Sequence, residues 1–104
     1  MSDHQHHIYQ LRATRTAMLT EGPDEREAEI LARHYEYLMD LGATGKLYLA
    51  GRTTNNDETT FGLALLNSGD EAAARAIMEN DPAVRSGVMT AELLPFRMAF
   101  PAGA

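Results

Sequence analysis

The chain has 104 residues, 44% of them hydrophobic and 23% charged, which predicts one soluble globular domain with a single two-layer core. Its formal net charge of −6 disfavours binding to nucleic acid or to an anionic membrane, because both require a basic protein surface. The lack of cysteine excludes disulfides, a thiolate nucleophile and cysteine-ligated zinc, and the lack of a membrane-length apolar run or a signal-peptide layout leads us to expect a cytoplasmic protein.

Residues 1–7 are polar and rich in histidine, with His4, His6 and His7 close together. A segment with nothing apolar to bury usually frays, so we predict that residues 1–7 are a disordered extension and that residues 8–104 form one domain. A metal site built from the three histidines is the less favoured alternative, because a fraying segment does not hold tetrahedral geometry without outside help. We therefore predict no metal site.

The first strand is predicted within residues 8–19, where apolar and polar residues alternate through the first half. Arg12 and Arg15 are expected to be solvated or to lie at the rim. The alternative is that one of them faces a ligand cleft and pairs with an anion, so Arg12 is a candidate ligand-binding residue. One face of this strand would carry Tyr9, Leu11 and Ala13.

A long helix is predicted to begin at Asp24 and to end near Leu41. Asp24 and Glu27 have the spacing of a capping box, and Gly42 supplies a left-handed stop. Apolar residues recur every three or four positions and define one buried stripe, with His34 on its shoulder. The stripe contains Ala28, Leu31, Tyr35 and Leu38.

Two apolar strands are predicted at residues 46–51 and 61–66. Residues 52–59 between them are polar and contain three consecutive Asn and Asp residues, which is typical of a loop. Strands joined by so short a connection should be antiparallel neighbours. Tyr48 and Arg52 are candidate ligand contacts in this region.

The second helix is predicted to start after Ser68, which has capping-box spacing to Glu71, and to end near Asn80. The proline at position 82 disfavours helical geometry at Asp81. We therefore expect the Asp81 carboxylate just beyond the C-terminus of this helix.

The last strand is predicted from Val88 to Leu94, and its alternation resumes after Pro95 and continues to Phe100. Proline cannot donate to a sheet ladder, so Pro95 is expected at an edge, a bulge or a strand break. Ser86, in the turn that precedes this strand, is a further candidate ligand contact.

The order strand, helix, strand, strand, helix, strand predicts an α+β protein with the ferredoxin-like βαββαβ arrangement. In this arrangement two helices pack on one face of a four-stranded antiparallel sheet. The other face shows apolar side chains from all four strands, so we predict a homodimer that pairs through it. A cleft between sheet and helices, or at the subunit junction, would be within reach of both His34 and Asp81.

Four short motifs stand in a characteristic order: His34-Tyr35-Glu36-Tyr37-Leu38, Gly42 and Gly45-Lys46-Leu47 leading to Ala50-Gly51-Arg52, Ser68-Gly69-Asp70-Glu71-Ala72, and Asn80-Asp81-Pro82 followed by Gly87. Their order and spacing resemble the YCII-related domain family over nearly all of the chain after Ile8. The resemblance implies a ferredoxin-like fold, a dimer, and a proposed active-site dyad made here by His34 and Asp81. The best-understood reaction of the family is elimination of a halide from a ring. Ala83-Val84 departs from the family, in which an aromatic residue often follows the proline, and the N-terminal extension is a second departure.

A histidine oriented by a carboxylate is suited to proton transfer near neutral pH. We therefore expect a cofactor-independent enzyme, of lyase or isomerase type, that moves a proton on a small aromatic or enolic molecule with His34 as acid and base and Asp81 as its orienter. A ligand-binding or accessory module of the same family is the alternative, and a cofactor-free oxygenase is a third. The residues also admit a purely structural interpretation, with His34 as a hydrogen-bonded core residue and Asp81-Pro82 as a helix stop.

Overall fold

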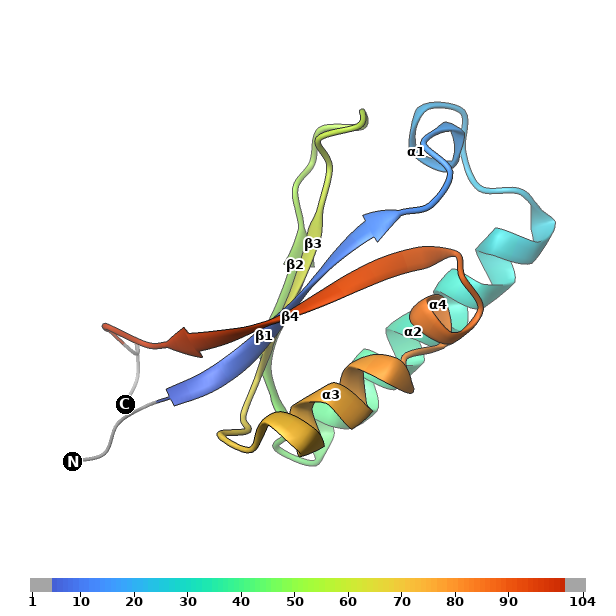
Figure 1. Cartoon of the computed structure of the whole chain (residues 1–104). Helices are drawn as coiled ribbons and strands as arrows, with labels where there is room; N and C mark the ends of the chain where they lie inside the picture. The colour runs from blue at the N-terminus through green and yellow to red at the C-terminus, as the bar shows by residue number, and fades with distance from the viewer. Residues whose placement is uncertain (1–4, 101–104) are drawn as a thin grey trace.

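The computed structural model describes residues 5–100 and shows a four-stranded sheet with all of its helices on one side (Figure 1). The strand order is β2-β3-β1-β4, and every neighbouring pair is antiparallel. The α+β, ferredoxin-like prediction is confirmed, with two one-turn helices added. The elements are β1 (Gln5–Ala13), α1 (Ala17–Thr20), α2 (Glu25–Ala43), β2 (Leu47–Arg52), β3 (Gly62–Leu66), α3 (Glu71–Glu79), α4 (Pro82–Arg85) and β4 (Met89–Arg97).

The core lies between the sheet and the helices. Every second residue of β1 faces the helices, because successive side chains of a strand point to opposite faces. Tyr9 and Leu11 of β1 are buried in this layer against Met78 of α3. The cluster of buried core residues is Tyr9, Leu11, Ala64, Leu66, Ala74 and Met78.

The first strand is displaced toward the N-terminus from its predicted position. β1 begins at Gln5 and ends at Ala13, so the expected disorder of residues 1–7 is wrong for residues 5–7, while residues 1–4 lie outside the described residues. The physical reason is pairing with β4, which extends as far as Gln5 opposite Arg97. The chain after Ala13 turns into α1, whose Met18 is buried.

The long helix α2 has the predicted start but a later end. The Asp24 carboxylate accepts a hydrogen bond from the backbone N–H of Glu27, and the Glu27 carboxylate accepts one from the N–H of Asp24, which completes the capping box. Gly42 is not the left-handed stop but lies inside the helix. Gly45 has the positive φ of 79°, and Lys46 donates to the Leu41 carbonyl at 2.8 Å, as in a Schellman motif.

The second long helix is capped by a different residue from the predicted one. Asp70, not Ser68, accepts a hydrogen bond from the Ala72 N–H at 3.1 Å, while the Ser68 hydroxyl donates to the Asp70 carbonyl. Later in the chain, β4 runs through Pro95 without a break. This is possible because β4 is an edge strand of the sheet, one of the three expected settings for Pro95.

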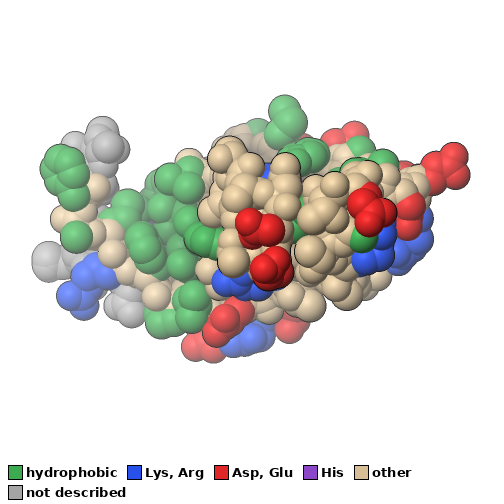
Figure 2. Space-filling view, turned by 90° about the horizontal axis from the view of Figure 1, so that it is seen from above, with side chains coloured by type: hydrophobic (Ala, Val, Ile, Leu, Met, Phe, Trp, Pro, Cys, Tyr) green, Lys and Arg blue, Asp and Glu red, His purple; other side chains and the backbone are tan. Residues whose placement is uncertain are grey.

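The second face of the sheet bears no helix among residues 5–100, and it is apolar at the end where β1 begins and polar toward Gln10, Arg12 and Glu92. Ile8 of β1 pairs with Leu65 of β3 and Leu94 of β4, so the three side chains share this face. Leu49 and Phe96 are exposed by 53% and 37%. Figure 2 shows hydrophobic side chains gathered at the left, over the end of the sheet where β1 begins and β4 ends. No helix within residues 5–100 is long and apolar enough to cross a membrane.

Candidate active site

His34 and Asp81, which lie 47 positions apart in the chain, meet beneath the helices. The His34 Nδ1 atom is 2.8 Å from Oδ1 and 2.9 Å from Oδ2 of Asp81. His34 is only 5% exposed, and Asp81 is fully buried. His34 lies in the middle of the buried face of α2, between Glu27 and Leu41, and not on its shoulder as predicted. The predicted stripe is wrong for Ala28 and Tyr35, which are exposed, because the helix is turned so that His34 faces Asp81.

Asp81 is held by the start of a helix rather than by the end of one. Its Oδ1 accepts a hydrogen bond from the backbone N–H of Ala83 at 2.9 Å, as the N-cap of α4, with Pro82 at the first helical position. Its ψ of 125° is the extended geometry expected before proline. The predicted position just beyond the C-terminus of a helix is confirmed, because α3 ends at Glu79 with Asn80 as its cap. The prediction missed α4, whose Ala83 N–H donates to the carboxylate.

Tyr9 is a third member of the group that the sequence did not point to. Its hydroxyl donates to Asp81 Oδ2 at 2.8 Å from the centre of β1. Burial, followed by the negative charge of Asp81 and the hydrogen bond to it, raises the pKa of Tyr9 well above its ordinary value, so the hydroxyl stays protonated and remains a donor. The only sequence signal was a tyrosine on the buried face of the first strand, where a hydroxyl needs a partner.

These contacts fix the role of each ring nitrogen of His34. With the Asp81 carboxylate as acceptor, Nδ1 carries the proton and donates. Within residues 5–100 no protein atom forms a hydrogen bond to Nε2 of this ring. In the neutral ring, Nε2 is therefore an available proton acceptor.

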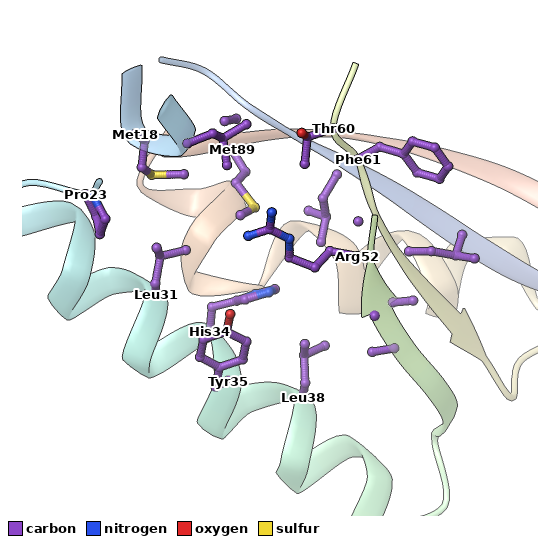
Figure 3. Close-up of a pocket in the computed structure, with 18 of the residues that line it drawn as sticks. Met18, Pro23, Leu31, His34, Tyr35, Leu38, Arg52, Thr60, Phe61 and Met89 are labelled. Carbon is purple, nitrogen blue, oxygen red and sulfur yellow. The ribbon is translucent and has the colours of Figure 1, made fainter. Parts of the chain in front are cut away.

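A cavity of about 420 Å³ lies beside His34, between α2 and the β2–β3 side of the sheet. Figure 3 shows His34 from α2 and Arg52 from the end of β2 pointing into the same space. The floor is hollow because the lining positions there are small, namely Ala50, Gly62 and Ala64. The polar residues of the lining are His34, Tyr35, Arg52, Asn56 and Thr60, and the large apolar ones include Leu11, Met18, Leu31, Leu38, Phe61 and Met89.

The segment between β1 and α2 closes one side of this cavity. Met18 of α1 and Pro23, which follows that helix, both line the cavity. Arg15 anchors this segment to α2 through two hydrogen bonds to the Glu27 carboxylate, from Nε at 2.9 Å and Nη2 at 2.6 Å. These bonds, with the one from the Asp24 backbone, lower the pKa of Glu27 to about 2. Arg15 is thus a structural anchor of the wall.

The structure brings only one of the four candidate ligand contacts to the cavity. Arg52 lines it, whereas Arg12 lies on the open face of the sheet with its guanidinium 5.5 Å from the centre of the Phe61 ring. Tyr48 is on the edge strand, where it meets the His6 ring edge-on. Ser86 ends α4 and bonds to backbone groups of its own turn.

The histidines at the start of the chain are separated by the strand that carries them. The buried His7 ring faces the helix side, where its Nδ1 is 2.8 Å from the Ser68 carbonyl oxygen, and His6 faces the opposite side. His4 lies outside the described residues. Among residues 5–100 no three His, Asp or Glu side chains come close enough together to hold a metal ion.

Comparisons with known proteins find structures of similar fold and one matching family. A structure of 5-chloro-2-hydroxyhydroquinone dehydrochlorinase from Burkholderia phenoliruptrix, in complex with 2,5-dihydroxybenzoquinone, is similar at 21% identity and a TM-score of 0.60, over 91% of this chain and 95% of that one. SnoaB, a cofactor-independent oxygenase from Streptomyces nogalater, is similar at 11% identity and a TM-score of 0.49, over 99% of this chain and 100% of that one. A comparison with curated proteins finds no match. The profile of the YCII-related domain matches residues 7–97, and the chain therefore belongs to this family.

Proposed function

We propose that the protein is a small enzyme that transfers a proton on a small molecule, without a cofactor, using His34 as the acid and base and Asp81 as its orienter. The observation that carries the proposal is the His34 ring itself. One nitrogen is 2.8 Å from the buried Asp81 carboxylate, and the other lies beside a cavity and has no hydrogen-bond partner among the described residues. This is the arrangement in which a carboxylate fixes the tautomer and stabilises the imidazolium.

In the proposed step, His34 Nε2 accepts a proton from a carbon or an oxygen of the substrate. The electron pair of the broken bond stays on the substrate, where it either delocalises onto an oxygen or expels a leaving group such as a halide. The imidazolium is stabilised by Asp81 and later returns the proton, to a second substrate atom in an isomerase or to solvent in a lyase. Tyr9 and the Ala83 N–H hold the carboxylate in place throughout.

The lining of the cavity supports an aromatic or enolic substrate. Its volume of about 420 Å³ is typical of small-molecule sites, and its large side chains are mostly apolar. The dehydrochlorinase with the similar fold acts on a chlorinated, hydroxylated ring. A ring of this kind has acidic protons, so a single positioned base is sufficient for the chemistry.

The test is turnover by matched histidine variants. We expect the wild-type protein to release chloride from 5-chloro-2-hydroxyhydroquinone, or to exchange deuterium from solvent into a panel of phenols and enolisable ketones. His34→Gln should lower the rate by roughly 10²- to 10⁴-fold. His7→Gln is the control, because His7 is also buried and hydrogen-bonded but lies outside the cavity. Binding of these compounds without turnover by the wild type at any pH would favour the accessory-module alternative.

We also propose that two copies pair through the open face of the sheet. The support is the apolar character of that face, including Ile8, Leu65 and Leu94, in a region that no helix covers. Leu94→Lys should shift the protein from dimer to monomer in analytical ultracentrifugation, because it places an unpaired charge in the interface. A wild-type protein that is monomeric at high concentration would contradict this proposal.

A further inference from the structure

We infer that the cavity takes its ligand as an anion, with a carboxylate, phenolate or enolate oxygen paired to the Arg52 guanidinium while the group to be deprotonated faces Nε2 of His34. The second half of this statement rests on the proposed function. The first half concerns binding alone, so the two can fail separately.

Arg52 is held in place by neutral groups only. Its Nε donates to the Thr53 carbonyl at 2.9 Å, and its Nη2 donates to the Asn55 carbonyl at 3.3 Å and to Oδ1 of Asn56 at 2.5 Å. Within the described part of the chain, no carboxylate lies within 4.0 Å of this guanidinium. The side chain is therefore positioned without being neutralised.

Other arginines show what Arg52 lacks. Arg15, Arg33 and Arg75 each contact a glutamate, at 2.6, 3.0 and 3.0 Å. Arg12 lies over an aromatic ring on the open face. Arg52 is exposed to solvent but lines a mostly apolar cavity, so its charge attracts an anion there although water partly screens it.

Arg52 lies where its positive charge can stabilise the negative charge that deprotonation leaves on the substrate. His34 comes from α2 and Arg52 from the end of β2, so a ligand between them touches both (Figure 3). When His34 removes a proton, the electron pair left behind moves to an oxygen, and an oxygen facing Arg52 would be stabilised there as an anion. Because Nε and Nη2 of Arg52 already donate to protein oxygens, the Nη1 atom supplies the N–H groups that would bind the anion.

The test is a comparison of two probes of equal shape, benzoate and its neutral amide, benzamide, titrated into the protein and followed by NMR shifts of the cavity residues. We expect the wild type to prefer benzoate by at least about tenfold, the effect of one charge-assisted hydrogen bond. Arg52→Gln should reduce this preference to near unity, and Arg52→Lys should retain part of it. Arg12→Gln is the matched control and should retain all of it, because Arg12 lies outside the cavity.

Repeating the titrations in His34→Gln removes any attraction from a protonated imidazole, and the preference for benzoate should persist there. A wild type that binds neither probe or binds both equally, or an Arg52→Gln variant that keeps the preference, would overturn the inference. Thermal unfolding of each variant checks that loss of preference is not loss of fold. If His34→Gln loses turnover but Arg52→Gln keeps the preference for benzoate, the proposed function stands and the inference about Arg52 is wrong. If Arg52→Gln loses the preference but His34→Gln keeps turnover, the inference about Arg52 stands and the proposed function is wrong.

Discussion

The two faces of the sheet are made by alternate residues of the same four strands. The cluster of buried polar groups and the cavity both lie on the face that the helices cover. On the covered face, Tyr9 reaches Asp81 beneath the helices, and a hollow remains beside His34. On the open face, the neighbouring residue Ile8 lies among other apolar side chains. Burial of polar groups is tolerated on the covered face because the ring Nδ1, the hydroxyl and the carboxylate meet as hydrogen-bond partners.

The largest expected effect comes from removing the buried Asp81 carboxylate, the shared hydrogen-bond acceptor of the covered face. Asp81→Ala leaves the Tyr9 hydroxyl, the His34 Nδ1–H and the Ala83 N–H without a partner, and should lower the free energy of unfolding by about 3–5 kcal/mol. Chemical denaturation measures this. Glu92→Ala, an exposed carboxylate on the open face, is the control and should change stability by less than about 0.5 kcal/mol. Equal effects of the two changes would erase the contrast between the faces.

A smaller effect is expected at the tyrosine. Tyr9→Phe removes one hydrogen bond to a buried charge and should cost about 1.5–3 kcal/mol of stability. As a positioning residue, Tyr9 should also affect the pH–rate profile, because Asp81 then has one donor fewer and His34 is stabilised differently as an imidazolium. Tyr48→Phe, at an exposed tyrosine outside the cavity, should leave both measurements unchanged.

A substitution that fills the cavity should change ligand binding without changing the stability of the fold. Ala50→Leu projects a larger side chain into the floor of the cavity and should weaken benzoate binding by about tenfold, which corresponds to about 1.4 kcal/mol. Stability should change little, since Ala50 is exposed to the cavity. Ala32→Leu on the outer surface of α2 is the control. Unchanged binding in Ala50→Leu would mean that benzoate binds elsewhere.

The smallest effect concerns the wall of the cavity and depends on pH. The pKa of Glu27 is lowered to about 2 from an ordinary value of 4.5, so the charged carboxylate stabilises the fold at pH values above 4.5. This contribution is lost as the pH falls from about 4.5 toward about 2, when the group becomes protonated. Glu27→Gln should therefore unfold more easily than the wild type at pH 7, and the difference should shrink toward pH 2.5. A constant difference would contradict this assignment.

The sequence predicted the elements well because each long one has a clear period. Alternation predicted the sheet, and the 3.6-residue repeat placed His34 on the inner face of α2. The errors lie where a local signal has two possible readings. Gly42 and Gly45 both fit a helix stop, and tertiary context selected Gly45. The polar residues 5–7 look disordered alone but are paired by β4, which comes more than eighty positions later.

The site was predictable in part. The meeting of His34 with Asp81 follows from the topology and the family resemblance, but the approach of Tyr9 does not, because the direction of one hydroxyl depends on how three elements pack together. The cavity also escaped prediction. It exists because several lining positions are occupied by glycine and alanine at once, and no local pattern marks such a coincidence.

His34 presents Nε2 to the cavity as a proton acceptor because Asp81 holds the proton on Nδ1. Long-range ¹H–¹⁵N correlation NMR of the neutral ring measures this directly, with benzoate added to occupy the cavity. We expect the proton to reside on Nδ1 and the Nε2 resonance to shift when benzoate binds. A proton residing on Nε2, or an Nε2 resonance indifferent to bound benzoate, would contradict this expectation.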